Sequence, residues 1–126
     1  MKRSMMQAYV QGSVQAAALY REAFGAELGY HVVNEDGSFY HAELTVFGQV
    51  VSLTEARCAG NCEAPVTGNT MQFCFHMEEG QEGLIAKAYE ALKEGGAVYF
   101  PIGPTDFSPC AFDVTDKFGV RWCMFL

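Results

Sequence analysis

The sequence predicts an α+β fold built from two tandem modules, each with the element order strand, helix, strand, strand, strand. One observation is a repeated Phe-Gly pair, at Phe47 and at Phe118, with a separation of 71 residues (118 − 47 = 71). A Gly-Ala pair recurs at Gly25 and at Gly96 with the same separation (96 − 25 = 71). The third observation is that both halves of the chain support the same order of elements. Two matches at one offset, together with this matching order, indicate an internal duplication.

In the first half, residues 5–11 are predicted to form a short strand. Ser13 is the predicted N-cap of the following helix, which carries apolar residues at helical spacing and ends at Gly25. Turns are expected at Asp36-Gly37 and at Gly48. They separate three predicted strands, "ELGYHVV", "FYHAELTVF" and "QVVSLTE".

The second half repeats this order after a segment rich in Gly, Asn and Pro, which we interpret as a linker. The strand "TMQFCFHM" leads to a helix that ends at Gly95-Gly96, and the strands "AVYFPI" (broken by Pro101), "CAFDVTD" and "GVRWCMFL" follow. We therefore expect one domain over residues 1–126, with module 1 at about 1–55, the linker at about 56–69 and module 2 at about 70–126. One module alone cannot bury its sheet, so the modules should close on each other or on a partner chain.

Composition narrows the function classes. Half of the 126 residues are hydrophobic, which favours a globular domain. The net charge of −7 argues against nucleic acid and against an anionic membrane surface as partners. No apolar run approaches the roughly 18 residues that a membrane span needs. The basic start "MKRSMMQAYV" lacks the apolar core of a signal peptide, so we expect a cytoplasmic protein.

The five cysteines form an odd set, which fits reduced thiols better than a disulfide framework. Cys58 and Cys62 form the one cluster that invites a metal or redox interpretation. Structural zinc sites need four ligands, and no second ligand pair lies nearby in the sequence. We therefore favour two reduced cysteines in a surface loop.

Four segments carry a family resemblance: "ALYREAFGAEL", "YHAEL", "TDKFGVRW" and, more weakly, "KEGGAVYFPI". Together with the duplication, they resemble the vicinal oxygen chelate superfamily, which includes glyoxalase I, extradiol dioxygenases and bleomycin-resistance proteins. Within it, the chain looks most like the PhnB-like branch, whose members often carry a demethylubiquinone methyltransferase name. The resemblance implies the glyoxalase/bleomycin resistance fold, a curved eight-stranded mixed sheet with a pocket on its concave side. It also implies a homodimer.

In the metal-dependent members of this superfamily, four ligands (His, Gln or Glu) come from the first and last strands of each module. The resemblance maps these positions to Met5, Ser52, Gln72 and Cys123. None of the four is an imidazole or a carboxylate, the donors that a divalent site of this type needs. We therefore expect no metal and no cofactor, and Cys123 as a small buried residue. The sequence also lacks the βαβ unit with a glycine-rich loop that would bind a methyl donor.

Alternation along the strands predicts which residues face the pocket, since residues two apart share a face of the sheet. Ala42, Leu44 and Val46 should pack under the helix, which leaves the intervening residues of the same strand facing the pocket. The face predicted to be inward is rich in polar side chains, as a small-molecule site is. The predicted ligand-binding residues are Gln7, Tyr9, His41, Glu43, Thr45, Ser52, Gln72, Arg121 and Cys123.

The favoured function is the binding or sequestering of a small molecule without the superfamily's metal site. One alternative is a metal-dependent lyase or oxidoreductase of the glyoxalase or dioxygenase type. Another is a metal-free enzyme in which His41 and Glu43 act as an acid/base pair, although a polar pair on a wet sheet face or a dimer contact is the simpler interpretation. Arg121 could hold an anionic group of the substrate or pair with Glu43 or Asp113.

Overall fold

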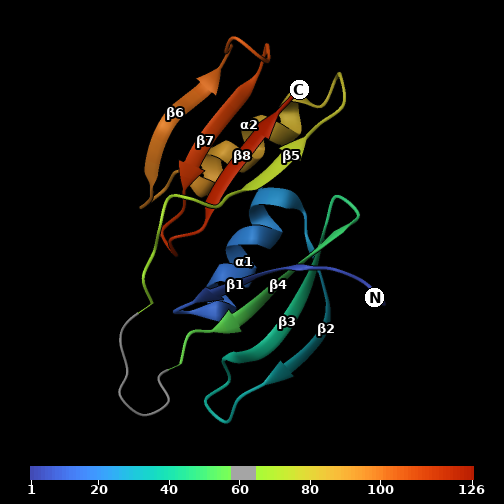
Figure 1. Cartoon of the computed structure of the whole chain (residues 1–126), viewed down its shortest axis with the longest axis vertical. Helices are drawn as coiled ribbons and strands as arrows, with labels where there is room; N and C mark the ends of the chain where they lie inside the picture. The colour runs from blue at the N-terminus through green and yellow to red at the C-terminus, as the bar shows by residue number, and fades with distance from the viewer. Residues whose placement is uncertain (58–64) are drawn as a thin grey trace. The chain divides into compact units, whose positions relative to one another are not determined.

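The computed structural model describes residues 1–57 and 65–126, in which eight strands and two helices follow the order predicted from the sequence (Figure 1). Cys58 and Cys62 lie outside the described residues. No helix within these two ranges is long and apolar enough to cross a membrane. The elements are β1 (Met6–Val10), α1 (Ser13–Phe24), β2 (Glu27–Val33), β3 (Phe39–Val46), β4 (Gln49–Glu55), β5 (Phe73–His76), α2 (Glu82–Leu92), β6 (Ala97–Gly103), β7 (Ala111–Thr115) and β8 (Arg121–Phe125).

The strands form two four-stranded mixed sheets, which confirms the duplicated β-α-β-β-β pattern. Their strand orders are β1-β4-β3-β2 and β5-β8-β7-β6. In each sheet the first strand pairs in parallel with the last strand of the same module, and the remaining pairs are antiparallel. The chain divides into two compact units, residues 1–66 and 67–126, called here the N-terminal and C-terminal units.

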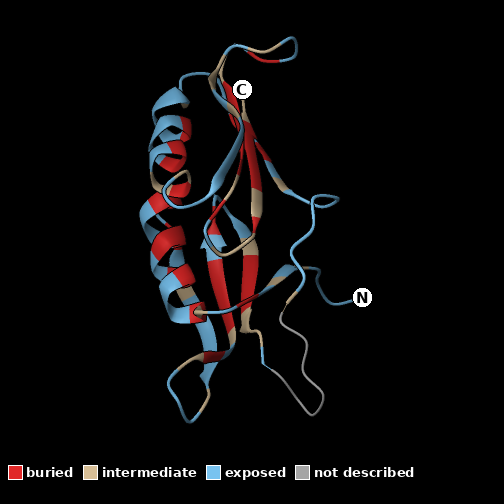
Figure 2. Cartoon of the chain, turned by 90° about the vertical axis from the view of Figure 1, so that its left-hand side faces the viewer, coloured by how far each residue is buried: buried red, intermediate tan, exposed pale blue. Residues whose placement is uncertain are grey.

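The core of each unit lies between its helix and one face of its sheet (Figure 2). Ala42, Leu44 and Val46 are fully buried, as the alternation of β3 predicts. In the C-terminal unit, Ile85 and Trp122 occupy the corresponding layer. Removal of these apolar side chains from water is the main force that holds each helix on its sheet.

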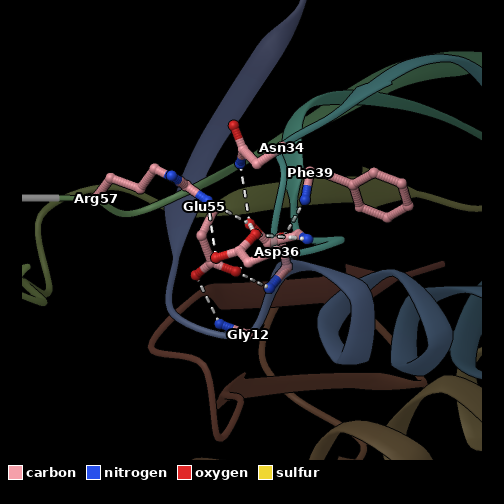
Figure 3. Close-up of polar contacts among 8 residues, drawn as sticks. Gly12, Asn34, Asp36, Phe39, Glu55 and Arg57 are labelled. Atoms are coloured by element: carbon pink, nitrogen blue, oxygen red, sulfur yellow. Dashed lines mark hydrogen bonds and ion pairs between the residues drawn. The ribbon is translucent and has the colours of Figure 1, made fainter.

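The prediction that Ser13 caps helix α1 is wrong. Gly12, with a φ of 88°, is the N-cap, and Ser13 is the first helical residue and is buried. The carboxylate of Glu55 takes over the capping role, because it accepts hydrogen bonds from the backbone N–H groups of Gly12 (2.9 Å) and Ser13 (3.0 Å) (Figure 3). The Ser13 hydroxyl donates to Glu55 (3.0 Å) and accepts from the N–H of Phe39 (2.9 Å). One network therefore joins the start of α1 to β3 and β4.

The repeated Phe-Gly pairs do precede the last strand of each module, but the two turns differ. Phe47 (φ 49°) and Gly48 (φ 79°) both adopt left-handed backbone conformations, as a two-residue hairpin of the primed type requires. The second turn is held by Asp116, whose Oδ1 accepts from the N–H groups of Phe118 (2.8 Å) and Val120 (3.1 Å). The duplication therefore preserves the position of the turn and not its chemistry.

Two strands of the C-terminal unit differ from their predicted extent. Strand β5 begins at Phe73, so Gln72 precedes it. Pro101 was expected to break its strand, but it lies within β6. Strand β6 is at the edge of the sheet, and its pairing with β7 is irregular on both sides of Phe100. An edge strand tolerates proline because the missing N–H faces away from the ladder.

Candidate ligand-binding site

The site lies on the face of the N-terminal sheet that is turned away from α1, called here the open face. Strand register places Gln7, Ser52 and Glu43 side by side across β1, β4 and β3. Two residues further along their strands, Tyr9 pairs with Thr54. Because side chains two residues apart share a face, these polar and aromatic groups form a continuous surface.

A pocket of about 590 Å³ opens along this surface. This volume falls within the range of sites that hold small organic molecules. The described residues that line it all belong to the N-terminal unit. They are Gln7, Tyr9, Asn34, Tyr40, His41, Thr54, Glu55, Ala56, Arg57 and Pro65.

The predicted pair of His41 and Glu43 forms, and a third residue joins it. His41 Nε2 lies 3.1 Å from Glu43 Oε1. Arg3 donates to both carboxylate oxygens, from Nη1 to Oε2 at 2.8 Å and from Nη2 to Oε1 at 2.6 Å. Hydrogen bonds from Arg3 and, secondarily, from His41 lower the pKa of Glu43 from 4.5 to about 2. The carboxylate is therefore an anion throughout the physiological pH range.

Among the predicted residues of this unit, only Gln7, Tyr9 and His41 line the pocket. Ser52 is fully buried on the same face, where its hydroxyl donates to Gln7 Oε1 (3.2 Å) or to the Met6 carbonyl (3.3 Å). Thr45 is exposed, and like Glu43 it does not line the pocket. Glu43 instead supports the side chain of His41.

Tyr40 is a pocket residue that alternation along β3 assigns to the wrong face. By strict alternation Tyr40 would share the buried face of Ala42, yet its side chain is exposed. A β-bulge explains the difference, because Val32 pairs with His41 while Val33 pairs with Phe39, which leaves Tyr40 unpaired. Sequence reasoning also missed Asn34, Glu55, Ala56, Arg57 and Pro65, most of which lie in the turns and chain segments that flank the strands. Arg3 was missed too, since it precedes the first strand.

The predicted residues of the C-terminal unit form a separate arrangement. Arg121 pairs with Asp113, one of the partners expected from the sequence, through Nε to Oδ1 at 2.9 Å and Nη2 to Oδ2 at 2.7 Å. Its third nitrogen donates to the Asn69 carbonyl (2.8 Å), and its guanidinium carbon lies 4.1 Å from the centre of the Tyr99 ring. The hydrogen bond with Asp113 raises the pKa of Arg121 above its already high value.

Strand register tests the four positions at which the superfamily places metal ligands. Ser52 and Cys123 are equivalent, as the 71-residue offset predicts, because each lies between the first and third strands of its sheet. Their neighbours on the first strands are Gln7 and Cys74, two residues beyond the mapped Met5 and Gln72.

This donor set does not suit a divalent metal ion. In the N-terminal unit, the neighbours Gln7, Ser52 and Glu43 supply an amide, a hydroxyl and a carboxylate. Arg3 already binds both oxygens of that carboxylate. Divalent sites of this type require imidazole or carboxylate donors from several strands. Within residues 1–57 and 65–126, no group of three or more His, Cys, Asp or Glu side chains is arranged to hold a metal.

Comparison with known proteins places this fold in a family. Residues 5–124 match the family model described as the Glyoxalase/Bleomycin resistance protein/Dioxygenase superfamily. The chain belongs to this superfamily. No curated protein sequence matches the chain.

Solved structures of the superfamily share the fold at low sequence identity. The PhnB protein from Bacillus cereus, which carries a 3-demethylubiquinone-9 3-methyltransferase name, is 21% identical with a TM-score of 0.77, over 100% of this chain and 99% of its own. TioX from Micromonospora sp. ML1 is 17% identical with a TM-score of 0.64, over 97% of each chain. A variant of the fosfomycin resistance protein FosX from Listeria monocytogenes, in complex with Mn(II) and 1S,2S-dihydroxypropylphosphonic acid, is 13% identical with a TM-score of 0.70, over 98% of this chain and 90% of its own. At these identities the likeness concerns the fold alone.

Proposed function

We propose that this protein binds a small molecule on the open face of its N-terminal sheet and acts as a binding or sequestering protein. The pocket of about 590 Å³, with aromatic side chains in its wall, is the observation that carries the proposal. Tyr9 and Tyr40 line it with side chains that are 64% and 65% exposed. Large aromatic side chains left open to solvent inside a concavity favour a ligand with a flat, unsaturated part.

The charges around the pocket favour a ligand that is neutral or weakly charged. Arg57 is paired with Asp36 at 2.8 Å, and Arg3 is paired with Glu43. Glu55 is engaged with the start of α1. The remaining polar groups of the lining are amides, hydroxyls and an imidazole, which recognise a ligand by hydrogen bonds and not by net charge.

Catalysis by His41 is the second candidate function, and a specific contact favours it. His41 lines the pocket, and Glu43 binds its Nε2, which is how a carboxylate orients a catalytic imidazole. Glu43 itself is a poor proton carrier near neutral pH because its pKa is about 2. In this candidate, His41 exchanges the proton and Glu43 fixes the orientation of its ring. A turnover rate that depends on pH and is lost in His41→Gln would favour catalysis over simple binding.

A thermal-shift screen of metabolites and antibiotics tests the proposed binding, since a ligand that binds only the folded protein raises its melting temperature. Antibiotics belong in the screen because FosX, a protein of the same fold, is described as a fosfomycin resistance protein. A ligand of the pocket should bind at least about ten-fold more weakly to Tyr9→Ala and to Tyr40→Ala. Phe107→Ala is the matched control, since Phe107 is 59% exposed and lies in the C-terminal unit. Binding that is unchanged in both tyrosine variants would refute the assignment of the pocket.

The proposal includes self-association as a homodimer. Strands β1 and β2 are the edges of one sheet, and β5 and β6 are the edges of the other. Exposed edges invite pairing, and twofold dimers are the commonest closed assembly. Light scattering on the purified chain at micromolar concentration tests this, and a stable monomer would contradict it.

A further inference from the structure

Two cysteines of the C-terminal unit are direct neighbours in its sheet. Cys74 on β5 and Cys123 on β8 are register partners in a parallel pair. Paired strands lie about 4.8 Å apart, and register partners in a parallel pair project from the same face, so the two thiols are adjacent. No disulfide joins the two cysteines. The proximity was not visible in the sequence, where 49 residues separate them (123 − 74 = 49).

The carboxylate beside Cys123 on the neighbouring strand is already engaged. Asp113 is the partner of Cys123 on β7, and Arg121 binds both of its carboxylate oxygens. Gln72 donates to the same carboxylate at 3.4 Å. Cys74, Cys123 and Asp113 lie side by side on β5, β8 and β7. Because Arg121 occupies the Asp113 carboxylate, the two sulfurs are the ligand atoms that these three residues offer.

The N-terminal unit provides an internal comparison. The equivalent row there consists of Gln7, Ser52 and Glu43, which present oxygen and nitrogen. The duplicated scaffold therefore carries a sulfur pair in one unit and oxygen groups in the other. The sulfur pair is a property of the side chains and not a requirement of the fold.

We propose that Cys74 and Cys123 bind a soft monovalent cation of the Cu(I) type through their two sulfurs. Thiolates select soft ions such as Cu(I), and a pair of donors matches the low coordination number that Cu(I) accepts, whereas structural zinc needs four donors. On binding, two S–H bonds break and two sulfur–metal bonds form. Both protons leave to solvent, and no electron is transferred.

The difference in exposure between the two cysteines suits this role. Cys74 is exposed and gives the ion a first contact from solvent, while Cys123 is buried and shields the bound ion. A cation that binds both sulfurs displaces their protons, so the affinity increases as the pH rises.

Competition with a coloured Cu(I) chelator under anaerobic, reducing conditions tests the proposal. The protein used in this test is the full chain with the substitutions Cys58→Ser, Cys62→Ser and Cys110→Ser. Cys74 and Cys123 are then the only remaining cysteines. This background protein should withhold one Cu(I) per chain from the chelator and show ultraviolet sulfur-to-copper absorption. The retained Cu(I) should rise with pH.

In the same background, Cys74→Ser should weaken Cu(I) binding at least about a hundred-fold, because one sulfur cannot hold the ion alone. Cys74 is exposed, so this variant tests the site without disturbing the core. Gln7→Ala, which changes the equivalent row of the N-terminal unit, is the matched control and should retain full binding. Equal Cu(I) binding with and without Cys74, or no retention by the background protein, would overturn the proposal. The result is independent of the proposed pocket, which lies in the N-terminal unit.

Discussion

The guanidinium of Arg3 binds both oxygens of the Glu43 carboxylate, at 2.8 and 2.6 Å. The contact joins a residue that precedes β1 to the middle of β3. His41 shares one of the same carboxylate oxygens, at 3.1 Å. The orientation of the pocket histidine therefore depends, through Glu43, on a residue 38 positions earlier in the chain (41 − 3 = 38).

Arg3→Met should return the pKa of Glu43 toward 4.5, because the largest cause of its lowering is lost. In the native protein this carboxylate has a pKa of about 2, so it stabilises the fold above pH 4.5, and this contribution is lost as the pH falls from 4.5 to about 2. The variant should lose less stability over that window than the native protein. Carboxyl chemical shifts and urea unfolding at several pH values measure both effects. Arg57→Met, which breaks the exposed pair with Asp36, is the control and should leave the pKa of Glu43 unchanged.

Glu55→Ala should lower the free energy of unfolding by about 1–2 kcal/mol, since it removes the acceptor for the first N–H groups of α1. Chemical denaturation measures the loss. Glu35→Ala is the matched control, because Glu35 is an exposed glutamate in the turn between β2 and β3. Equal losses in the two variants would show that the network of Figure 3 does not stabilise the helix start.

A thiol-alkylating reagent at neutral pH should modify Cys74 much faster than Cys123. The thiolate is the reactive form, and burial raises the pKa of Cys123 to about 12. Mass spectrometry of peptides after short reaction times measures the two rates. The same shift predicts that stability falls as the pH rises above 9, where the thiol ionises in the unfolded chain but not in the folded one. Comparable rates at both cysteines would contradict the burial of Cys123.

The protein should not retain Ni, Zn, Mn or Fe in stoichiometric amount after loading and dialysis, because the donors of the N-terminal row do not suit such ions. Elemental analysis measures the metal content. Retention that disappears in His41→Ala would contradict this and restore a metal-dependent function. Retention lost instead in a Cys58→Ser, Cys62→Ser double variant would assign the ion to those two cysteines and leave the pocket without metal.

The fold was largely predictable because periodic patterns report it directly. The 71-residue offset identified the duplication, and alternation along β3 correctly buried Ala42, Leu44 and Val46. The start of α1 was not predictable from local rules. A serine before a helix is a common N-cap, but the capping group here comes from Glu55, which lies 43 residues away from Gly12.

The site was only partly predictable, because it depends on register and on irregularities of pairing. Alternation found Gln7, Tyr9 and His41, but a bulge in β3 moved Tyr40 to the exposed side. The ligand position on the first strand of module 2 was mapped to Gln72, whereas the residue that the register places beside Cys123 is Cys74. A sequence fixes the face of a strand residue only when the strand is regular, and it does not fix which residue lies opposite.

The left-handed backbone of Phe47 has a consequence for the order of folding. A bulky residue with φ of 49° costs roughly 1 kcal/mol or more, so the β3–β4 hairpin is disfavoured while it stands alone. In the folded unit the ring of Phe47 packs edge-on against Phe24, at 6.0 Å between centroids, at the end of α1. The contact between Phe47 and Phe24, which offsets the conformational cost of the turn, exists only after the helix has docked. We therefore expect this hairpin to form in the same cooperative step that brings α1 onto the sheet.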